Sequence, residues 1–192
     1  IQGHTDGILK LSDKELGILE IKSINSRNFS ELKSEKPEHK KQGLIYAYCI
    51  EQRRQYLKEK YPTEEGFSKS KFARTLYYRK KYSYLQDGSR YSREEKINFQ
   101  VKLAMDCDSL LYHCDTPVTK VIFLYENKDT QDLKEYCVSS TSADAKTTLD
   151  TMLTEFEELN KDILEGTVPS RAGTNKSCQT CRWCNYKTEC WN

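Results

Sequence analysis

The sequence has no apolar run approaching the roughly 20 residues that a membrane-spanning helix needs, and no charged-then-apolar leader. It also has no internal repeat and no low-complexity segment. These absences argue against membrane insertion, secretion and a repeat architecture. Hydrophobic residues still make up 36% of the 192 residues, so we expect one folded α/β domain with a real core.

An initiating Met is also missing from the sequence. The chain begins at Ile1, close to a predicted strand. We therefore expect that an N-terminal segment precedes these residues in the complete protein.

The net charge of +2 conceals an uneven distribution of charge. Residues 53–102 contain 14 Lys and Arg against 6 Asp and Glu, and 7 of the 13 tyrosines. Basic side chains neutralise phosphates and aromatic rings stack on unpaired bases, so this segment is a candidate for binding nucleic acid. The alternative is a solvated insertion without a ligand. If DNA binds here, we expect contacts from Arg74, Arg79, Lys80 and Lys81.

The residue pattern predicts a mixed β-sheet flanked by helices. Its periodicity, turn residues and helix stop signals predict these elements in order: a hairpin over 1–24, a polar loop over 25–34, a helix over 37–60, helical pieces over 68–82 and 92–112, strands over 118–127 and 133–139, and a helix over 142–165. Thr141 or Ser142 is the expected cap of the last helix, and Gly166 its stop.

Two residues of the first hairpin share one face of a strand. Side chains two apart along a strand point the same way, so Glu20 and Lys22 are neighbours while Ile21 points into the opposite packing layer. Asp6 precedes Glu20 by 14 residues, and the intervening turn can bring the two carboxylates together. Two carboxylates suit Mg²⁺, which prefers oxygen ligands and keeps several waters. Lys22 could then orient an attacking water.

Three successive motifs resemble those of the RecB-like branch of the PD-(D/E)-x-K nucleases: Gly3-His4-Thr5-Asp6-Gly7, Leu19-Glu20-Ile21-Lys22 and Gln42-Gly43-Leu44-Ile45-Tyr46. The last motif of that family reads Gln-x-x-x-Tyr. The resemblance implies a restriction-endonuclease-like core and metal-ligand roles for Asp6 and Glu20. It also implies a catalytic role for Lys22 and supporting roles for Gln42 and Tyr46, with Mg²⁺ or Mn²⁺ as the metal.

One other segment and one other residue could be interpreted in the same way. Glu126-Asn127-Lys128 repeats the Glu-x-Lys pattern, but no Asp precedes it at hairpin distance and no Gln-x-x-x-Tyr follows it. His4 shares a strand face with Asp6. The histidine of many RecB-like nucleases lies instead on a helix upstream of the first motif, so that role is not transferred to His4.

Four of the eight cysteines form a compact run near the C-terminus, Cys178, Cys181, Cys184 and Cys190. This spacing suits an iron-sulfur cluster better than the two separated Cys-x-x-Cys knuckles usual for zinc, which is the runner-up. The run is also similar to the tail motif of iron-sulfur RecB-like nucleases, a branch that includes AddB and the nuclease of CRISPR adaptation. That resemblance implies a 4Fe-4S cluster, with Cys178 or an upstream cysteine as the fourth ligand. The scattered cysteines, such as Cys49, are expected to be small buried residues.

These features together predict a nuclease core over 1–166, with a basic Tyr-rich insertion at about 61–105, and a cysteine-cluster tail over 167–192. The expected function is a metal-dependent DNase, an exonuclease in recombination or phage DNA processing, with DNA and a recombination protein as partners. Free thiols favour a cytoplasmic location. Two alternatives stay open, a non-catalytic DNA-binding module and a sequence-specific endonuclease. Digestion polarity, strand preference and oligomeric state are not determined by the sequence.

Overall fold

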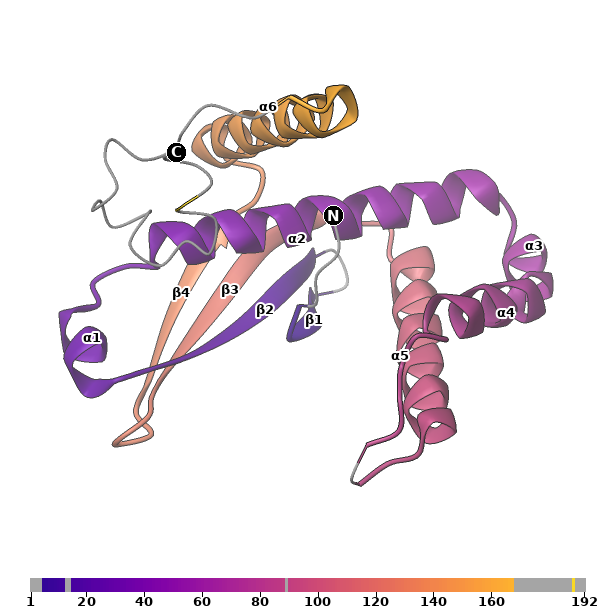
Figure 1. Ribbon diagram of the computed structural model, residues 1–192, viewed down its shortest axis with the longest axis horizontal. Coiled ribbons are helices and arrows are strands. Elements are labelled where there is room, and N and C mark those ends of the chain that lie inside the picture. The colour runs from indigo at the N-terminus through magenta and orange to yellow at the C-terminus, as the bar shows by residue number, and fades with distance from the viewer. Residues whose placement is uncertain (1–4, 13–14, 89, 168–187, 189–192) are drawn as a thin grey trace. The chain divides into compact units, whose positions relative to one another are not determined.

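The computed structural model describes residues 5–12, 15–88, 90–167 and 188 (Figure 1). The chain divides into two compact units, Ile1–Leu149 and Asp150–Asn192. The elements along the chain are β1 (Gly7–Ser12), β2 (Glu15–Ile24), α1 (Ser26–Glu31), α2 (Pro37–Lys60), α3 (Glu64–Lys69), α4 (Lys71–Lys81), α5 (Arg93–His113), β3 (Val118–Asn127), β4 (Leu133–Ser139) and α6 (Ala143–Glu165).

The strands described belong to the first unit and form one mixed sheet in the order β1-β2-β3-β4. β1 pairs with β2 and β3 pairs with β4 in antiparallel hairpins, whereas β2 and β3 pair in parallel. Parallel neighbours need a long crossover connection, which here contains the helices α1 to α5. The predicted α/β class, with a mixed sheet flanked by helices, is confirmed.

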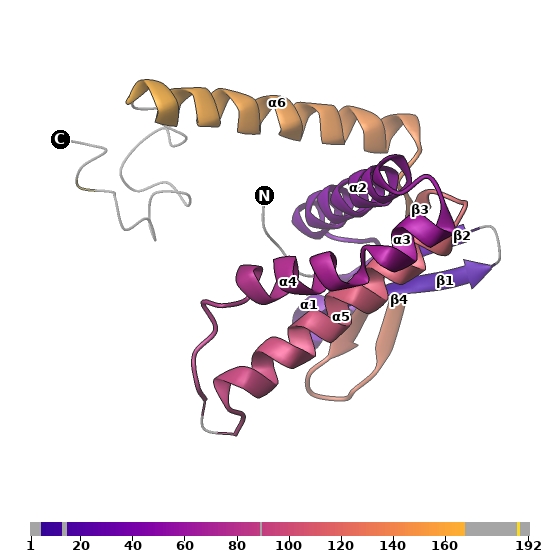
Figure 2. The ribbon, with the colours of Figure 1, turned by 90° about the vertical axis from the view of Figure 1, so that its right-hand side faces the viewer.

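Helix α2 packs across one face of the sheet (Figures 1 and 2). The facing strand positions are apolar and buried, among them Ile18 of β2 and Val121 and Phe123 of β3. Gly43 allows the helix to approach closely, because a Cβ atom there would lie 2.6 Å from Val121 Cγ1 and 2.8 Å from Phe123 Cζ. The residues on either side of Gly43 are therefore held close to the sheet.

Helices α3, α4 and α5, here called the helical arm, follow the C-terminal end of α2 (Figure 2). The arm has a small core of its own, in which Tyr78 and Tyr82 of α4 pack with Ile97 and Val101 of α5. A capping box formed by Ser92 and Glu95 starts α5. The arm corresponds to the predicted basic insertion, and helix α3 within it was not predicted.

The prediction of a polar loop over residues 25–34 is wrong. Asn25 accepts a hydrogen bond from the Asn28 amide and so caps the short helix α1. The helix buries Phe29, and Leu32 just after it, in the main core. Two apolar side chains in an otherwise polar segment are enough to fix a helix once the sheet supplies a surface for them.

The sheet face opposite α2 is more open in the described residues than expected. Ile21 is 44% exposed and so does not pack into a second buried layer. On the edge strand β4, the residues on this face are likewise exposed, including Leu133 and Cys137. The polar site and the main core therefore share the face that α2 covers.

Helix α6 begins and ends at the predicted signals. The Ser142 hydroxyl accepts from the Ala145 amide at 3.1 Å, and Gly166 adopts a left-handed φ of 67° just after the last turn. No helix among the described residues is long and apolar enough to cross a membrane.

Candidate active site

Asp6 lies beside Glu20 because of the register of the first hairpin. Gly7 pairs with Leu19, so Asp6, one residue earlier, is next to the position of Glu20. The Asp6 carboxylate accepts a hydrogen bond from the Ile21 amide at 2.7 Å. The Thr5 hydroxyl donates to the Leu19 carbonyl at 3.0 Å, which ties the preceding residue to the same strand.

Glu20 and Lys22 form an ion pair on the face of β2 that α2 covers. The Lys22 ammonium donates to Glu20 Oε2 at 3.0 Å, and the Glu20 side chain is only 2% exposed. Leu16 and Ile18, which precede Glu20 on this face, are fully buried. The site is thus the polar end of an apolar stripe.

Two side chains of α2 complete the cluster. Lys22 donates a second hydrogen bond, to Gln42 Oε1 at 2.8 Å, and Gln42 Nε2 donates to the Tyr46 hydroxyl at 3.0 Å. Residues four apart lie on one helix face, so Gln42 and Tyr46 both reach the sheet. A continuous chain of hydrogen bonds therefore joins Glu20, Lys22, Gln42 and Tyr46, and Asp6 is held at the backbone of the adjacent residue.

One oxygen of Glu20 has no hydrogen-bond partner among the described residues. Glu20 Oε1 is buried and unpaired, while Oε2 is bound to Lys22. An unpaired buried carboxylate oxygen costs free energy, so this atom is suited to receive a cation. The described residues contain no group of three or more His, Cys, Asp or Glu that could hold a metal. Asp6 and Glu20 are two carboxylates, the number that Mg²⁺ uses when waters and phosphate oxygens supply its other ligands.

His39 is a site neighbour that sequence reasoning missed. Its Nδ1 lies 2.9 Å from the hydroxyl of Tyr125, which also accepts from the Lys36 amide at 3.0 Å. Tyr125 is the register partner of Lys22 on the parallel strand β3. Burial, with a smaller contribution from the Lys22 charge, lowers the pKa of His39, so the neutral imidazole is favoured. The position of His39 three residues before Gln42 was the only signal in the sequence.

The second Glu-x-Lys sequence lies elsewhere. Glu126 pairs in register with Ser23 and accepts from its hydroxyl at 2.8 Å. Ser23 alternates with Lys22 along β2, so this contact lies on the opposite sheet face. Only the first copy meets the Gln-x-x-x-Tyr helix.

Next to the site, a groove of about 530 Å³ runs between the sheet, α2 and the helical arm. Thr5 and Tyr46 line it at the site end, and Arg53 and Lys81 line it on α2 and α4. The groove therefore begins at residues that adjoin Asp6 and Gln42.

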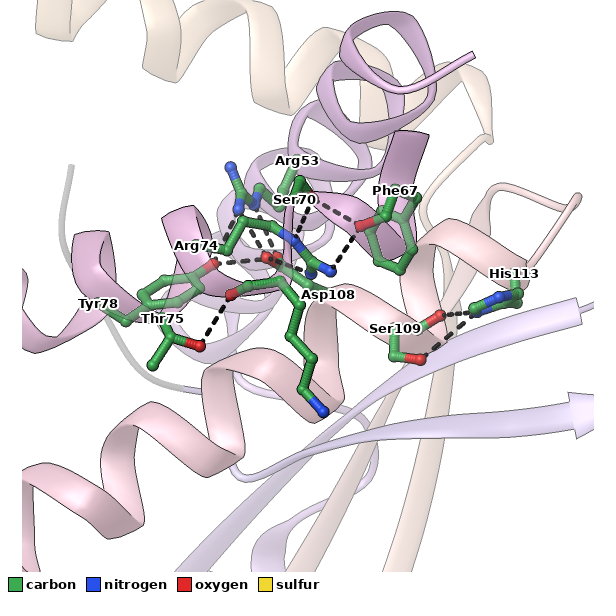
Figure 3. Close-up of polar contacts among 10 residues, drawn as sticks. Arg53, Phe67, Ser70, Arg74, Thr75, Tyr78, Asp108, Ser109 and His113 are labelled. Carbon is green, nitrogen blue, oxygen red and sulfur yellow. Dashed lines mark hydrogen bonds and ion pairs between the residues drawn. The ribbon is translucent and has the colours of Figure 1, made fainter. Parts of the chain in front are cut away.

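The basic residues of the arm differ in exposure and in whether they already bind a carboxylate. Arg74 is buried in an ion pair with Asp108, so it cannot contact DNA as the sequence suggested (Figure 3). Arg79 donates to Glu94 at 2.6 Å and to Asn98 at 2.8 Å. Lys80 and Lys81 are exposed and have no carboxylate partner among the residues described.

Several predicted sites fall outside the described residues: His4 and the cysteines Cys178, Cys181, Cys184 and Cys190. Among the scattered cysteines, Cys114 is buried, Cys49 and Cys107 are half-buried, and Cys137 is exposed. The expectation that these thiols are core residues is thus correct for Cys114 alone.

No protein-family model, no curated protein and no solved structure matches this chain. The functional interpretation therefore depends on the motifs and on the geometry of the cluster around Glu20.

Proposed function

We propose that this protein is a metal-dependent deoxyribonuclease with a restriction-endonuclease-like core, which hydrolyses phosphodiester bonds at the Asp6, Glu20 and Lys22 cluster. The observation that carries the proposal is the unpaired, buried Oε1 of Glu20, next to Lys22 and Asp6. Buried polar atoms in folded proteins are nearly always hydrogen-bonded, so the unpaired oxygen supports a role in binding a cation.

Asp6 and Glu20 would hold a Mg²⁺ or Mn²⁺ ion. When bound, the ion lowers the pKa of a coordinated water and neutralises charge on the phosphate. The unpaired Glu20 oxygen and the exposed Asp6 carboxylate supply hard oxygen ligands of the kind that Mg²⁺ prefers.

Lys22 is positioned to act on the attacking water or on the phosphate. An ammonium has three N–H donors, and two of them are used by Glu20 and Gln42. The third remains for a water or for a phosphate oxygen that gains negative charge during hydrolysis. Hydrolysis adds the oxygen of water to phosphorus and breaks the bond to the leaving sugar oxygen, which takes up a proton.

Gln42 and Tyr46 fix the direction of that third N–H. The amide of Gln42 accepts from Lys22 and donates to Tyr46, so its orientation is set at both ends. The Tyr46 hydroxyl still has its own proton to donate. These two side chains are therefore positioning residues in the proposed reaction.

The same proposal includes an exonuclease activity, a role in recombination or phage DNA processing and a protein partner, which rest on the sequence resemblance. It also includes a cytoplasmic location, which rests on the free thiols. The 4Fe-4S cluster, with zinc as the runner-up, stays a prediction, because its four cysteines lie outside the described residues. Iron and sulfide analysis of protein purified without oxygen tests it directly.

Digestion of end-labelled linear and closed circular DNA with Mg²⁺, Mn²⁺ or EDTA tests the function. We expect metal-dependent cleavage of linear DNA, with circular DNA spared by an exonuclease and cut into defined fragments by a sequence-specific endonuclease. Asp6→Asn and Lys22→Gln should remove cleavage, whereas the matched control Glu126→Gln, in the second Glu-x-Lys sequence, should retain it. DNA binding without any metal-dependent cleavage would favour the alternative, a non-catalytic DNA-binding module.

A further inference from the structure

The groove beside the site is lined by both apolar and cationic side chains. The apolar ones include Ile8 of β1, Ile50 of α2 and Leu103 of α5. The cations are Arg53 of α2 and Lys81 of α4. A volume of about 530 Å³ lies within the usual range for small-molecule sites, roughly 300 to 1,000 Å³, so it can accept a single nucleotide.

Arg53 is held in one orientation by a buried carboxylate. Its Nε and Nη2 donate to the two oxygens of Asp108 at 2.9 and 2.8 Å, a bidentate pair, and Nη2 also donates to the Tyr78 hydroxyl at 2.8 Å (Figure 3). Nη1 has no partner among the described residues, and the Arg53 side chain is 30% exposed. A guanidinium fixed in this way presents its remaining N–H groups at little further entropic cost.

The charge of this network is positive. Arg53 and Arg74 both bind the single carboxylate of Asp108. Tyr78 stays protonated, because burial and the Asp108 charge raise the pKa of its hydroxyl. One positive charge is therefore left over, and Lys81 adds another at the same groove.

Aromatic rings lie along the same path. Tyr46, which is half-buried, lines the groove at the site end and is the ring available to a base, since Tyr78 and Tyr82 on α4 also line the groove but are buried in the core of the arm. Aromatic side chains stack with unpaired bases, whereas a base in a duplex is already stacked and paired and must be extruded before it can enter such a groove.

We propose that this groove binds one unpaired nucleotide of the DNA strand adjacent to the bond that is cut, with its phosphate at Arg53 and Lys81 and its base against Tyr46 and the apolar lining residues. The proposal rests on the proposed function, because it assigns the groove to the same substrate. In this proposal, the helical arm makes the protein bind a single-stranded DNA end in preference to a paired one.

Two matched pairs of variants test this groove. Lys81→Ala removes a groove cation, while Lys80→Ala removes the neighbouring exposed cation outside the groove. Leu103→Glu places a carboxylate in the groove, while Leu76→Glu changes an equally exposed leucine on the arm that does not line it. All four positions are exposed, so the fold should survive, and thermal unfolding checks that it does.

The measurement is fluorescence anisotropy with labelled oligothymidine and with a hairpin duplex, in EDTA so that neither is cut. We expect Lys81→Ala to reduce the slope of log affinity against log salt by about 0.7 for the single strand. Leu103→Glu should weaken single-strand binding about tenfold, within the range of losing one stacked base. Lys80→Ala, Leu76→Glu and the duplex should show smaller changes.

Equal effects of the two lysines, or unchanged binding in Leu103→Glu, would overturn the groove proposal. Metal-dependent cleavage by the unmodified protein is scored separately, so the two ideas can fail independently. A groove that binds single strands in a protein that cuts nothing would keep the subsite and reject the nuclease.

Discussion

Two buried carboxylates in the first unit differ in how many hydrogen-bond donors they bind. Asp108, at the centre of the helical arm, binds Arg53 through both oxygens, and Arg74 and Tyr78 supply further donors. Glu20, on β2, is equally buried but binds one donor group, Lys22, through one oxygen. Both side chains are 2% exposed, so burial alone does not separate them.

The difference indicates what each carboxylate contributes. Four donor contacts satisfy Asp108 completely, which is the pattern of a structural junction between α2, α4 and α5. Glu20 keeps an oxygen that the described residues do not satisfy, while Lys22 binds its other oxygen and the Asp6 carboxylate binds the amide of the next residue, Ile21. Unsatisfied burial is a cost that folding alone does not explain, and metal binding would offset it.

The largest expected effect is on activity and metal binding at Glu20. Glu20→Gln keeps the shape of the side chain and an oxygen acceptor for Lys22, but it removes the negative charge that a cation needs. We expect cleavage to fall to background while the thermal midpoint in EDTA stays within a few degrees. Mn²⁺ should raise the midpoint of the unmodified protein by mass action and leave that of the variant unchanged.

A variant that unfolds, or one that still gains stability from Mn²⁺, would remove the distinction drawn between the two carboxylates. Glu126→Gln serves as the control for a carboxylate outside the site, and it should respond to Mn²⁺ as the unmodified protein does.

At Asp108 the effect should be on stability. Asp108→Asn leaves the buried Arg74 guanidinium without a carboxylate, and breaking a buried pair typically costs about 3 kcal/mol or more. Urea unfolding measures this change in the free energy of unfolding. Asp115→Asn, which disrupts an exposed pair with Lys58, should cost far less, because solvent screens the pair. Similar losses at the two positions would show that the Asp108 network is not a structural junction.

The sequence was sufficient where the determining signals are local. Residues 37–60 form the predicted helix because Pro37 begins it and Pro62 follows its end. Both hairpins follow from alternating apolar residues and polar turns. Glu20 and Lys22 are neighbours because side chains two apart lie on one face of a strand. Gln42 and Tyr46 are neighbours because residues four apart lie on one face of a helix.

Contacts between residues that are distant in the sequence could not be predicted from such local signals. The parallel pairing of β2 with β3 brings Tyr125 beside Lys22, and His39 meets Tyr125 across 86 residues of sequence. Arg53 and Asp108 are 55 residues apart. A count of basic residues could not show that Arg74 is enclosed while Lys81 is available, because that depends on which face of α4 packs against α5.

A smaller effect is expected at Tyr46. Tyr46→Phe keeps the ring that lines the groove but removes the hydroxyl that accepts from Gln42, so Gln42 and then Lys22 lose their fixed orientation. Small misplacements of catalytic groups cost up to about a hundredfold in rate, and we expect kcat to fall about tenfold with KM nearly unchanged. A rise in KM with constant kcat would instead assign Tyr46 to substrate binding alone.

The smallest effect concerns pH and His39, which faces the charges of Lys22, Lys36 and Glu38. Burial and then Lys22 lower its pKa in the folded protein below the ordinary value of 6.5, so the unfolded chain takes up this proton first as the pH falls. The stability from neutral His39 is therefore fully present above about pH 6.5 and declines below it, until the folded state is protonated as well. His39→Gln retains a partner for Tyr125 but cannot titrate, so urea unfolding across this window should show a flatter dependence on pH than in the unmodified protein. Parallel pH curves for the two proteins would mean that folding does not lower the pKa of His39.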